Sequence, residues 1–176
     1  MLSEFSTCQI AYVVPDVRVA AARHAALFGS GPFFTVENIE FSWVKYRGQP
    51  TDWDHTIAIG QWGDIGIEFM QQNNAGPSVL LDVTPEGSTR GAVHHMAYMV
   101  PDPAGMAARF AEAGYPLALH GALGNGIEVF MVDTLDLYGH MIELYEPTPA
   151  LLAIHGYVRD QSIGWDGTDP IRTLTF

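Results

Sequence analysis

The sequence predicts an α+β domain built from two copies of one strand–helix–strand unit. Residues 9–16 read QIAYVVPD and residues 95–102 read HMAYMVPD, with five of the eight positions identical at an offset of 86 (95 − 9). Further along, residues 67–71 read IEFMQ and residues 142–146 read IELYE. Two elements that recur in the same order indicate a duplicated structural unit.

An alanine-rich stretch with the signals of a short helix follows each copy of the first element. The two stretches cover residues 17–29 and 103–114. Each begins after an aspartate, Asp16 or Asp102, which is a residue type that caps helix N-termini, and each closes at a glycine. We therefore predict one helix in each half.

The remainder of each half is rich in β-forming residues and is punctuated by glycine. The expected strands lie at residues 33–36, 41–46, 56–61 and 127–132. Each half thus reads as a strand, a helix and then about three further strands.

The chain divides into a repeated part and a tail that has no counterpart in the first half. We assign a domain to residues 1–147, with one module at about 7–75 and a second at about 92–147. Residues 148–176 are expected to form a C-terminal helix, around 150–157, and an extended tail. Trp165 in that tail suggests an ordered wrap or a dimer contact.

The charge balance excludes several classes of partner. The chain has 8 basic and 20 acidic side chains, a net charge of −12, and its one lysine is Lys45. Without clustered cations, nucleic acid and anionic membrane surfaces are poor partners. No apolar run is long enough to span a membrane and no secretion signal is recognisable, so we expect a cytoplasmic protein. A single cysteine excludes an intramolecular disulfide.

Four polar residues occupy equivalent positions of the repeat, each within an apolar strand. Gln9 corresponds to His95, and Glu68 corresponds to Glu143. A carboxylate in so apolar a strand is costly to bury unless it is paired, protonated or bound to a metal. If the halves pack about a pseudo-twofold axis, the four side chains converge. One imidazole, one amide and two carboxylates suit one divalent ion of Zn, Ni, Co, Mn or Fe.

Each of the four residues also has a structural interpretation. The glutamates could face solvent on edge strands, the histidine could be a hydrogen-bonded core residue, and an isolated glutamine would attract no attention. The coincidence of all four with two pairs of repeat positions favours the metal site.

At these residues the sequence resembles the vicinal-oxygen-chelate superfamily. Its members include glyoxalase I, methylmalonyl-CoA epimerase, extradiol dioxygenases and bleomycin- and fosfomycin-resistance proteins. The resemblance covers about residues 8–147 and rests on QIAYVVPDV, VHHMAYMVPD and VDTLDLYGHMIELYEP. It implies two βαβββ modules that form a U-shaped mixed β-sheet cup with flanking helices, commonly as a homodimer. It also implies that Gln9, Glu68, His95 and Glu143 hold the metal, two from each module.

The resemblance implies an enzyme that transfers a proton α to a carbonyl in a small carbonyl or thioester substrate. This would be an isomerase, an epimerase or a glyoxalase-type lyase, with Glu68 and Glu143 as catalytic bases. The alternative is a binding protein of the antibiotic-resistance type that sequesters its ligand. A ring-cleaving dioxygenase is less favoured because extradiol enzymes use two histidines and one glutamate. The basic residues with which glyoxalase I holds glutathione are not matched, since Val13 stands at one of them and Arg90 lies one residue from another.

Six further residues are candidates for the substrate pocket. Three share a strand face with the proposed ligands, and three are cations that could meet a carboxylate or phosphate: Met70, Met99 and Tyr145, and Lys45, Arg47 and Arg90. Core packing and solvated charge are the respective alternatives. His94 is predicted to point away from His95, and His55 and His140 are weaker candidates.

Overall fold

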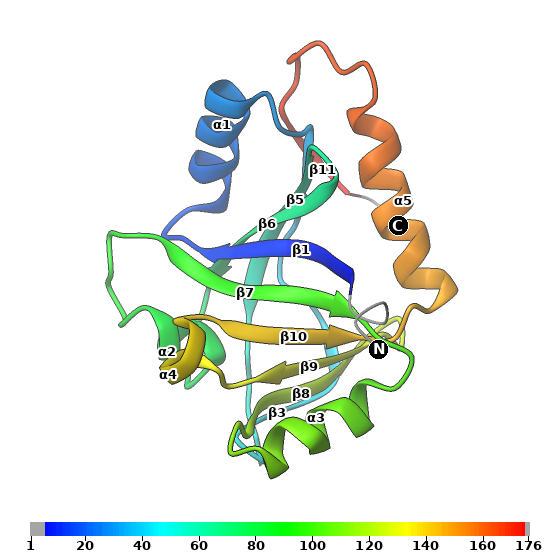
Figure 1. Ribbon diagram of the computed structural model, residues 1–176. Helices are drawn as coiled ribbons and strands as arrows, with labels where there is room; N and C mark the ends of the chain where they lie inside the picture. The colour runs from blue at the N-terminus through cyan, green and yellow to red at the C-terminus, as the bar shows by residue number, and fades with distance from the viewer. Residues whose placement is uncertain (1–5, 175–176) are drawn as a thin grey trace.

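The computed structural model describes residues 6–174, which contain eleven strands and five helices. The strands are β1 (Ser6–Val13), β2 (Phe33–Val36), β3 (Phe41–Tyr46), β4 (Gln49–Pro50), β5 (His55–Trp62), β6 (Ile65–Gln72), β7 (Ala92–Met99), β8 (Leu117–Leu123), β9 (Glu128–Val132), β10 (Met141–Tyr145) and β11 (Ile171–Thr173). The helices are α1 (Val17–Phe28), α2 (Val79–Val83), α3 (Pro103–Glu112), α4 (Leu135–Tyr138) and α5 (Pro149–Ser162). Figure 1 shows one curved sheet with helices around it.

The strand order is that of a duplicated unit. All eleven strands form one sheet in the order β11-β2-β5-β6-β1-β7-β10-β9-β8-β3-β4. β1 and β7 are antiparallel neighbours at its centre, and each also pairs in parallel with the last strand of its own half, β6 or β10. The run β2-β5-β6-β1 is therefore mirrored by β8-β9-β10-β7. The predicted α+β fold with two βαβββ modules is confirmed.

Two additions extend the edges of this sheet. The segment from Phe41 to Tyr46 is a strand as predicted, but it pairs with β8 of the other half and carries the β3–β4 hairpin with it. At the opposite edge, β11 pairs in parallel with β2. The tail thus returns to the sheet, and Trp165 packs against the cluster beneath α1. The preceding helix, α5, is longer than the predicted 150–157.

Capping residues mark the N-termini of α1 and α3 and the C-terminus of α1. The side chain of Asp16 accepts a hydrogen bond from the Val19 amide at 2.9 Å, and Asp102 accepts one from the Gly105 amide at 2.9 Å. Both predicted N-caps are confirmed. α1 ends at Gly29, whose φ of 64° lies in the left-handed region that glycine adopts without strain.

The sheet has an outer face under α1 and α3 and an inner face that holds the largest core cluster. α1 packs on β5 and β6, and α3 packs on β8, β9 and β10. The inner cluster joins Val44 of β3, Met70 of β6 and Met131 of β9, strands that lie far apart in the sheet order. Side chains from such distant strands touch only if the sheet curls, which gives the predicted U shape.

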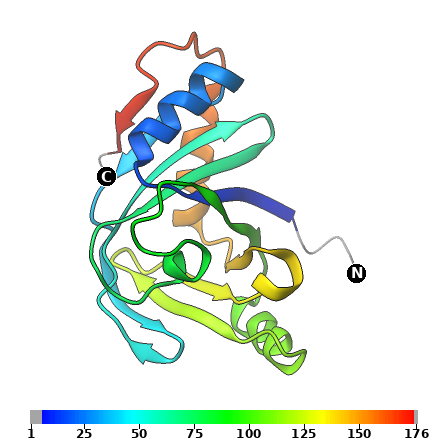
Figure 2. The same ribbon diagram turned by 90° about the vertical axis from the view of Figure 1, so that its left-hand side faces the viewer.

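The short helix α2 and the C-terminal helix α5 cover the inner face. Val79 and Leu80 of α2 are fully buried in the inner cluster, whereas α5 lies against β5. Figure 2 shows α1 in front of the β5–β6 part of the sheet and α5 behind it. The inner face is therefore closed by α2 towards one end and by α5 towards the other.

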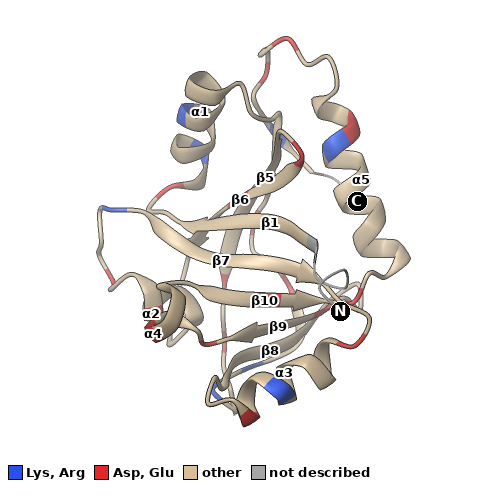
Figure 3. Cartoon of the chain, in the orientation of Figure 1, with Lys and Arg blue, Asp and Glu red and all other residues tan. Residues whose placement is uncertain are grey.

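The surface bears charge of both signs. Figure 3 shows Lys and Arg spread over α1, α3, α5 and the loops rather than gathered over one element. Within residues 6–174, none of the helices combines the length and apolar character needed to cross a bilayer.

Candidate metal centre

The four predicted ligands come from the four central strands of the sheet. Glu68 lies on β6, Gln9 on β1, His95 on β7 and Glu143 on β10, and these strands are consecutive in the sheet (Figure 1). All four side chains are buried, with relative exposures of 6%, 6%, 0% and 2%. The sheet thus brings together residues up to 134 positions apart (143 − 9) in the sequence.

Small residues separate the four along the sheet. Ala11 pairs with both Glu68 and His95, and Ala97 pairs with both Gln9 and Glu143. Because cross-strand partners share a face, all four polar side chains project from the inner face. The two alanines, which are fully buried, keep the space between these side chains free of larger groups.

The polar atoms approach one another around His95. Its Nε2 lies 2.9 Å from Oε2 of Glu143 and 3.6 Å from Oε2 of Glu68. The amide Nε2 of Gln9 donates a hydrogen bond to the same Glu68 oxygen at 2.7 Å. The contact between His95 and Glu143 has the distance of an ion pair but not the geometry of a hydrogen bond, so both atoms are buried without a hydrogen-bond partner.

His94 is a neighbour of this cluster because β7 bulges. Ala11 pairs with His95 whereas Tyr12 pairs with Val93, so His94 is left without a partner on β1. Its imidazole therefore turns to the same side as that of His95, and their Nδ1 atoms are 2.8 Å apart. The prediction that His94 points away from His95 is wrong, because strict alternation of side chains fails at a bulge.

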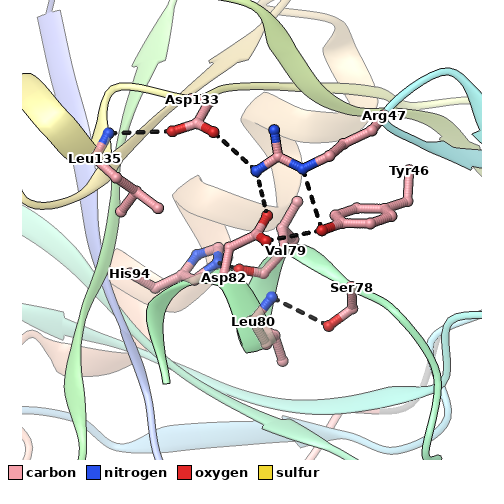
Figure 4. Close-up of polar contacts among 9 residues, drawn as sticks. All are labelled: Tyr46, Arg47, Ser78, Val79, Leu80, Asp82, His94, Asp133 and Leu135. Carbon is pink, nitrogen blue, oxygen red and sulfur yellow. Dashed lines mark hydrogen bonds and ion pairs between the residues drawn. The ribbon is translucent and has the colours of Figure 1, made fainter. Parts of the chain in front are cut away.

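The hydrogen bonds of His94 fix the proton positions of both rings. Nε2 of His94 lies 3.0 Å from the carbonyl oxygen of Val79 (Figure 4), and a carbonyl only accepts, so this nitrogen carries the proton. Burial lowers the pKa of His94 well below its usual value, which keeps the ring neutral and leaves Nδ1 as an acceptor. His95 must then donate from its own Nδ1. In the neutral form of His95, the Nε2 lone pair faces the two carboxylates.

The buried cluster favours a proton or a cation between its carboxylates and His95. Burial raises the pKa of Glu68 to about 8, with the negative charge of Glu143 adding to the rise and His95 opposing it. Burial disfavours the charged form of His95, but the neighbouring Glu143 and Glu68 outweigh it and raise the pKa of His95. An imidazole lone pair and a carboxylate oxygen 2.9 Å apart repel unless a cation or a proton lies between them.

These donors fit a divalent metal ion. Two ligands at about 2.1 Å from a metal and at right angles to each other are about 3.0 Å apart, close to the separation of His95 Nε2 and Glu143 Oε2. Gln9 would present its oxygen after a half-turn of its amide, which exchanges the oxygen and nitrogen positions. Within residues 6–174, however, no three His, Cys, Asp or Glu side chains already have the arrangement of a bound metal site.

A narrow cavity of about 40 Å³ opens next to Gln9 between the sheet and α5. Its sheet side includes Ile59 and Gln61 of β5, and its helix side includes His155. Ile59 pairs with Glu68, so the cavity lies on the inner face with the four polar residues. A larger groove at the opposite end of β1 includes Arg90 but none of the four. The smaller cavity therefore touches the cluster, through Gln9.

The predicted apolar pocket residues have different surroundings. Met70 is buried in the inner cluster, against which Tyr145 also packs. Burial, together with the charges of Glu143 and Glu68, raises the pKa of Tyr145 well above its usual value, which shows that this phenol is close to the carboxylates. Met99 lies between Ser6 and Tyr145 at the end of β7.

The predicted cationic residues are not brought to the cluster. Arg47 forms ion pairs with Asp82 at 2.9 Å and Asp133 at 2.8 Å, so it ties the β3–β4 turn to α2 and to the loop before α4 (Figure 4). Lys45 is exposed on β3, and Arg90 lines the larger groove. None of the three lines the cavity beside Gln9.

Two residues near the cluster were not predicted as site residues from the sequence. Cys8 occupies an irregularity of β1 between Thr7 and Gln9, and burial raises the pKa of its thiol to about 12, with a further contribution from Glu143. His155 on α5 lines the cavity. Burial lowers the pKa of His155 while the charge of Glu143 opposes this. His155 lies outside the repeat, and Cys8 lies directly before the repeated segment 9–16, so neither was marked by the repeat that indicated the other four.

Comparison with known families is consistent with this fold. The family model of the Glyoxalase/Bleomycin resistance protein/Dioxygenase superfamily matches residues 8–130. The chain belongs to this superfamily. None of the curated proteins compared with the sequence matches it.

Several solved structures share the fold at low sequence identity. A methylmalonyl-CoA epimerase is 19% identical, with 81% of this chain and 95% of that chain covered and a TM-score of 0.52. The epimerase from Mycobacterium tuberculosis is 17% identical, with 84% and 91% covered and a TM-score of 0.54. A Streptomyces coelicolor epimerase variant in complex with 2-nitronate-propionyl-CoA is 14% identical, with 81% and 97% covered and a TM-score of 0.51.

Proposed function

We propose that this superfamily member is a metal-dependent enzyme that transfers a proton at the carbon α to a carbonyl. Gln9, Glu68, His95 and Glu143 would hold one divalent ion of Zn, Ni, Co, Mn or Fe. The observation that supports this most directly is the position of the buried Nε2 of His95, 2.9 Å from Oε2 of Glu143, with neither atom hydrogen-bonded. A bound metal would act as a Lewis acid that stabilises negative charge on the substrate oxygen.

The protein's own residues supply orientation and proton transfer. His94 holds the ring of His95 through its bond to Nδ1, and Val79 holds His94 in turn. Glu68 and Glu143 approach His95 from strands on its two sides. One carboxylate would remove the substrate proton and the other, or the same one, would return it. A positioned carboxylate accelerates such a step by about 10²–10⁴-fold.

The substrate class follows from the superfamily and from the cavity. Several of the solved structures that share the fold are methylmalonyl-CoA epimerases, and some of these contain an acyl-CoA ligand. We infer a small carbonyl or thioester substrate, with epimerisation, isomerisation or a glyoxalase-type lyase reaction as the outcome. The homodimer and the cytoplasmic location remain predictions.

The test combines metal content with proton exchange. The purified protein is analysed for transition metals and incubated in D₂O with methylmalonyl-CoA, ethyl 2-methylacetoacetate or lactaldehyde, and deuterium at the α-carbon is followed by NMR. We expect one metal per chain and exchange with at least one probe, lost in Glu68→Gln and Glu143→Gln. Glu146→Gln, at an exposed residue beside β10, is the matched control.

The alternative is a ligand-sequestering protein. It is favoured by the absence, within residues 6–174, of a ready-made set of three acidic, histidine or cysteine ligands. A protein that is metal-free after purification in metal-containing medium and catalyses no exchange, yet binds a small hydrophobe beside Gln9, would support this alternative.

A further inference from the structure

The cavity beside Gln9 has one wall that neither half of the repeat supplies. α5 follows the last strand of the second module, and its residues Ile154, His155 and Val158 line the cavity. With the buried Leu151, these residues occupy one face of the helix at spacings of three and four. His155 is thus an imidazole on a face that is otherwise apolar and directed at the sheet.

His155 has no hydrogen-bond or ion-pair partner among residues 6–174, although it is only partly exposed. A half-buried imidazole with no protein partner keeps its hydrogen-bonding capacity for water or for a molecule in the cavity. His155 and Gln9 line the same cavity, which places the ring beside the proposed metal centre. A substrate in the cavity would give the imidazole a partner.

The lack of a side chain at Gly66 keeps this narrow cavity open beside Gln9. Gly66 lies on β6 beside Gln9, and an added Cβ would come within 3.0 Å of the Cys8 carbonyl oxygen and 3.6 Å of Gln9 Cβ. The other walls are Ile59, Ile67, Ile154 and Val158, with Gln9 and Gln61 as polar groups, and no Lys, Arg, Asp or Glu of the described chain lines it. This chemistry suits a short uncharged chain that carries a carbonyl.

We propose that His155 is a catalytic residue that contacts the substrate's α-carbon region and exchanges a proton with it, and that the cavity takes a short, uncharged acyl segment. The inference rests on the proposed function and gives one of its two proton transfers to His155, a residue from outside the repeat, while Glu68 or Glu143 carries the other. In the forward step the α-C–H bond breaks, its electron pair moves into the carbonyl to give an enolate, and the proton forms an N–H bond with the imidazole. Return of the proton to carbon restores the neutral ring.

The test is deuterium exchange with the same three probes in His155→Ala and His155→Gln. We expect exchange to fall by about 10²-fold or more in both variants with the metal content unchanged. Added imidazole is expected to restore part of the activity of His155→Ala and none of that of His155→Gln, in which the side chain still fills the site. A purely structural role would not give this rescue. His120→Ala is the control, because His120 lies on β8 and pairs with Glu128 away from the cavity.

The outcomes separate the two proposals. Wild-type exchange that persists in full in His155→Gln overturns the role of His155 and leaves the proposed function standing. A wild-type protein that exchanges no probe overturns both. If His155→Ala does not fold, His155→Gln alone decides, since it keeps a side chain of similar reach and polarity.

Discussion

The metal-free protein should become less stable as the pH rises from about 4.5 to about 8. Burial raises the pKa of Glu68 from 4.5 to about 8, so between these values the folded protein holds a proton that the unfolded chain has released. Stability falls with rising pH wherever the folded state binds more protons. The stability linked to this proton is therefore fully present below pH 4.5 and is lost as the pH passes about 8. The raised pKa of His95 acts in the same direction.

The size of this loss of stability follows from the rise in the pKa of Glu68. Since one pKa unit corresponds to about 1.4 kcal/mol, the rise at Glu68 amounts to at most about 5 kcal/mol. That is comparable with the whole stability of many domains, about 5–15 kcal/mol. For a chain of this size the melting temperature should fall by roughly 10 °C or more across the range.

Thermal unfolding of chelator-treated protein between pH 4.5 and 8.5 measures the effect. Glu68→Gln should flatten the dependence, because an amide binds no proton in this range, whereas Glu146→Gln should leave it unchanged. A saturating divalent metal should also flatten it, since the cation keeps Glu68 ionised. Equal slopes for the metal-free wild-type protein and Glu68→Gln would refute the reasoning.

Three further changes test other parts of the structure. His94→Phe should weaken metal binding by about 10–100-fold in a chelator competition, because the ring of His95 loses its Nδ1 partner; unaltered affinity would count against that role. Gly66→Ala should reduce α-deuterium exchange because the added Cβ presses on the Cys8 carbonyl oxygen next to Gln9, whereas Gly124→Ala, whose added Cβ meets only a carbonyl oxygen at 3.8 Å, should not. Arg47→Ala should lower the free energy of unfolding in urea by about 1 kcal/mol, and Arg18→Ala, in an exposed pair, by less; equal losses would contradict the link to α2.

The internal repeat explains why the four central residues could be predicted from the sequence. Gln9 and His95 occupy equivalent positions of the repeat, as do Glu68 and Glu143, so packing of the halves about a pseudo-twofold axis predicts that the four side chains converge. The structure confirms that these four side chains lie together on the inner face. Their role as metal ligands remains a prediction.

The features that could not be predicted from the sequence depend on contacts between segments far apart in the chain. The bulge that turns His94 towards His95 arises where β7 pairs with β1, and no local signal marks it. The pairing of β3 with β8 joins an insertion of one half to the edge of the other. His155 was missed because α5 has no counterpart in the repeat that would give its position.

Metal analysis of the purified protein, combined with anomalous diffraction from its crystals, tests the central claim most directly. The account predicts one divalent metal per chain and one anomalous peak bounded by Gln9, Glu68, His95 and Glu143. A peak elsewhere, or a metal-free protein in which Nε2 of His95 is protonated and hydrogen-bonded to Glu143, would contradict it.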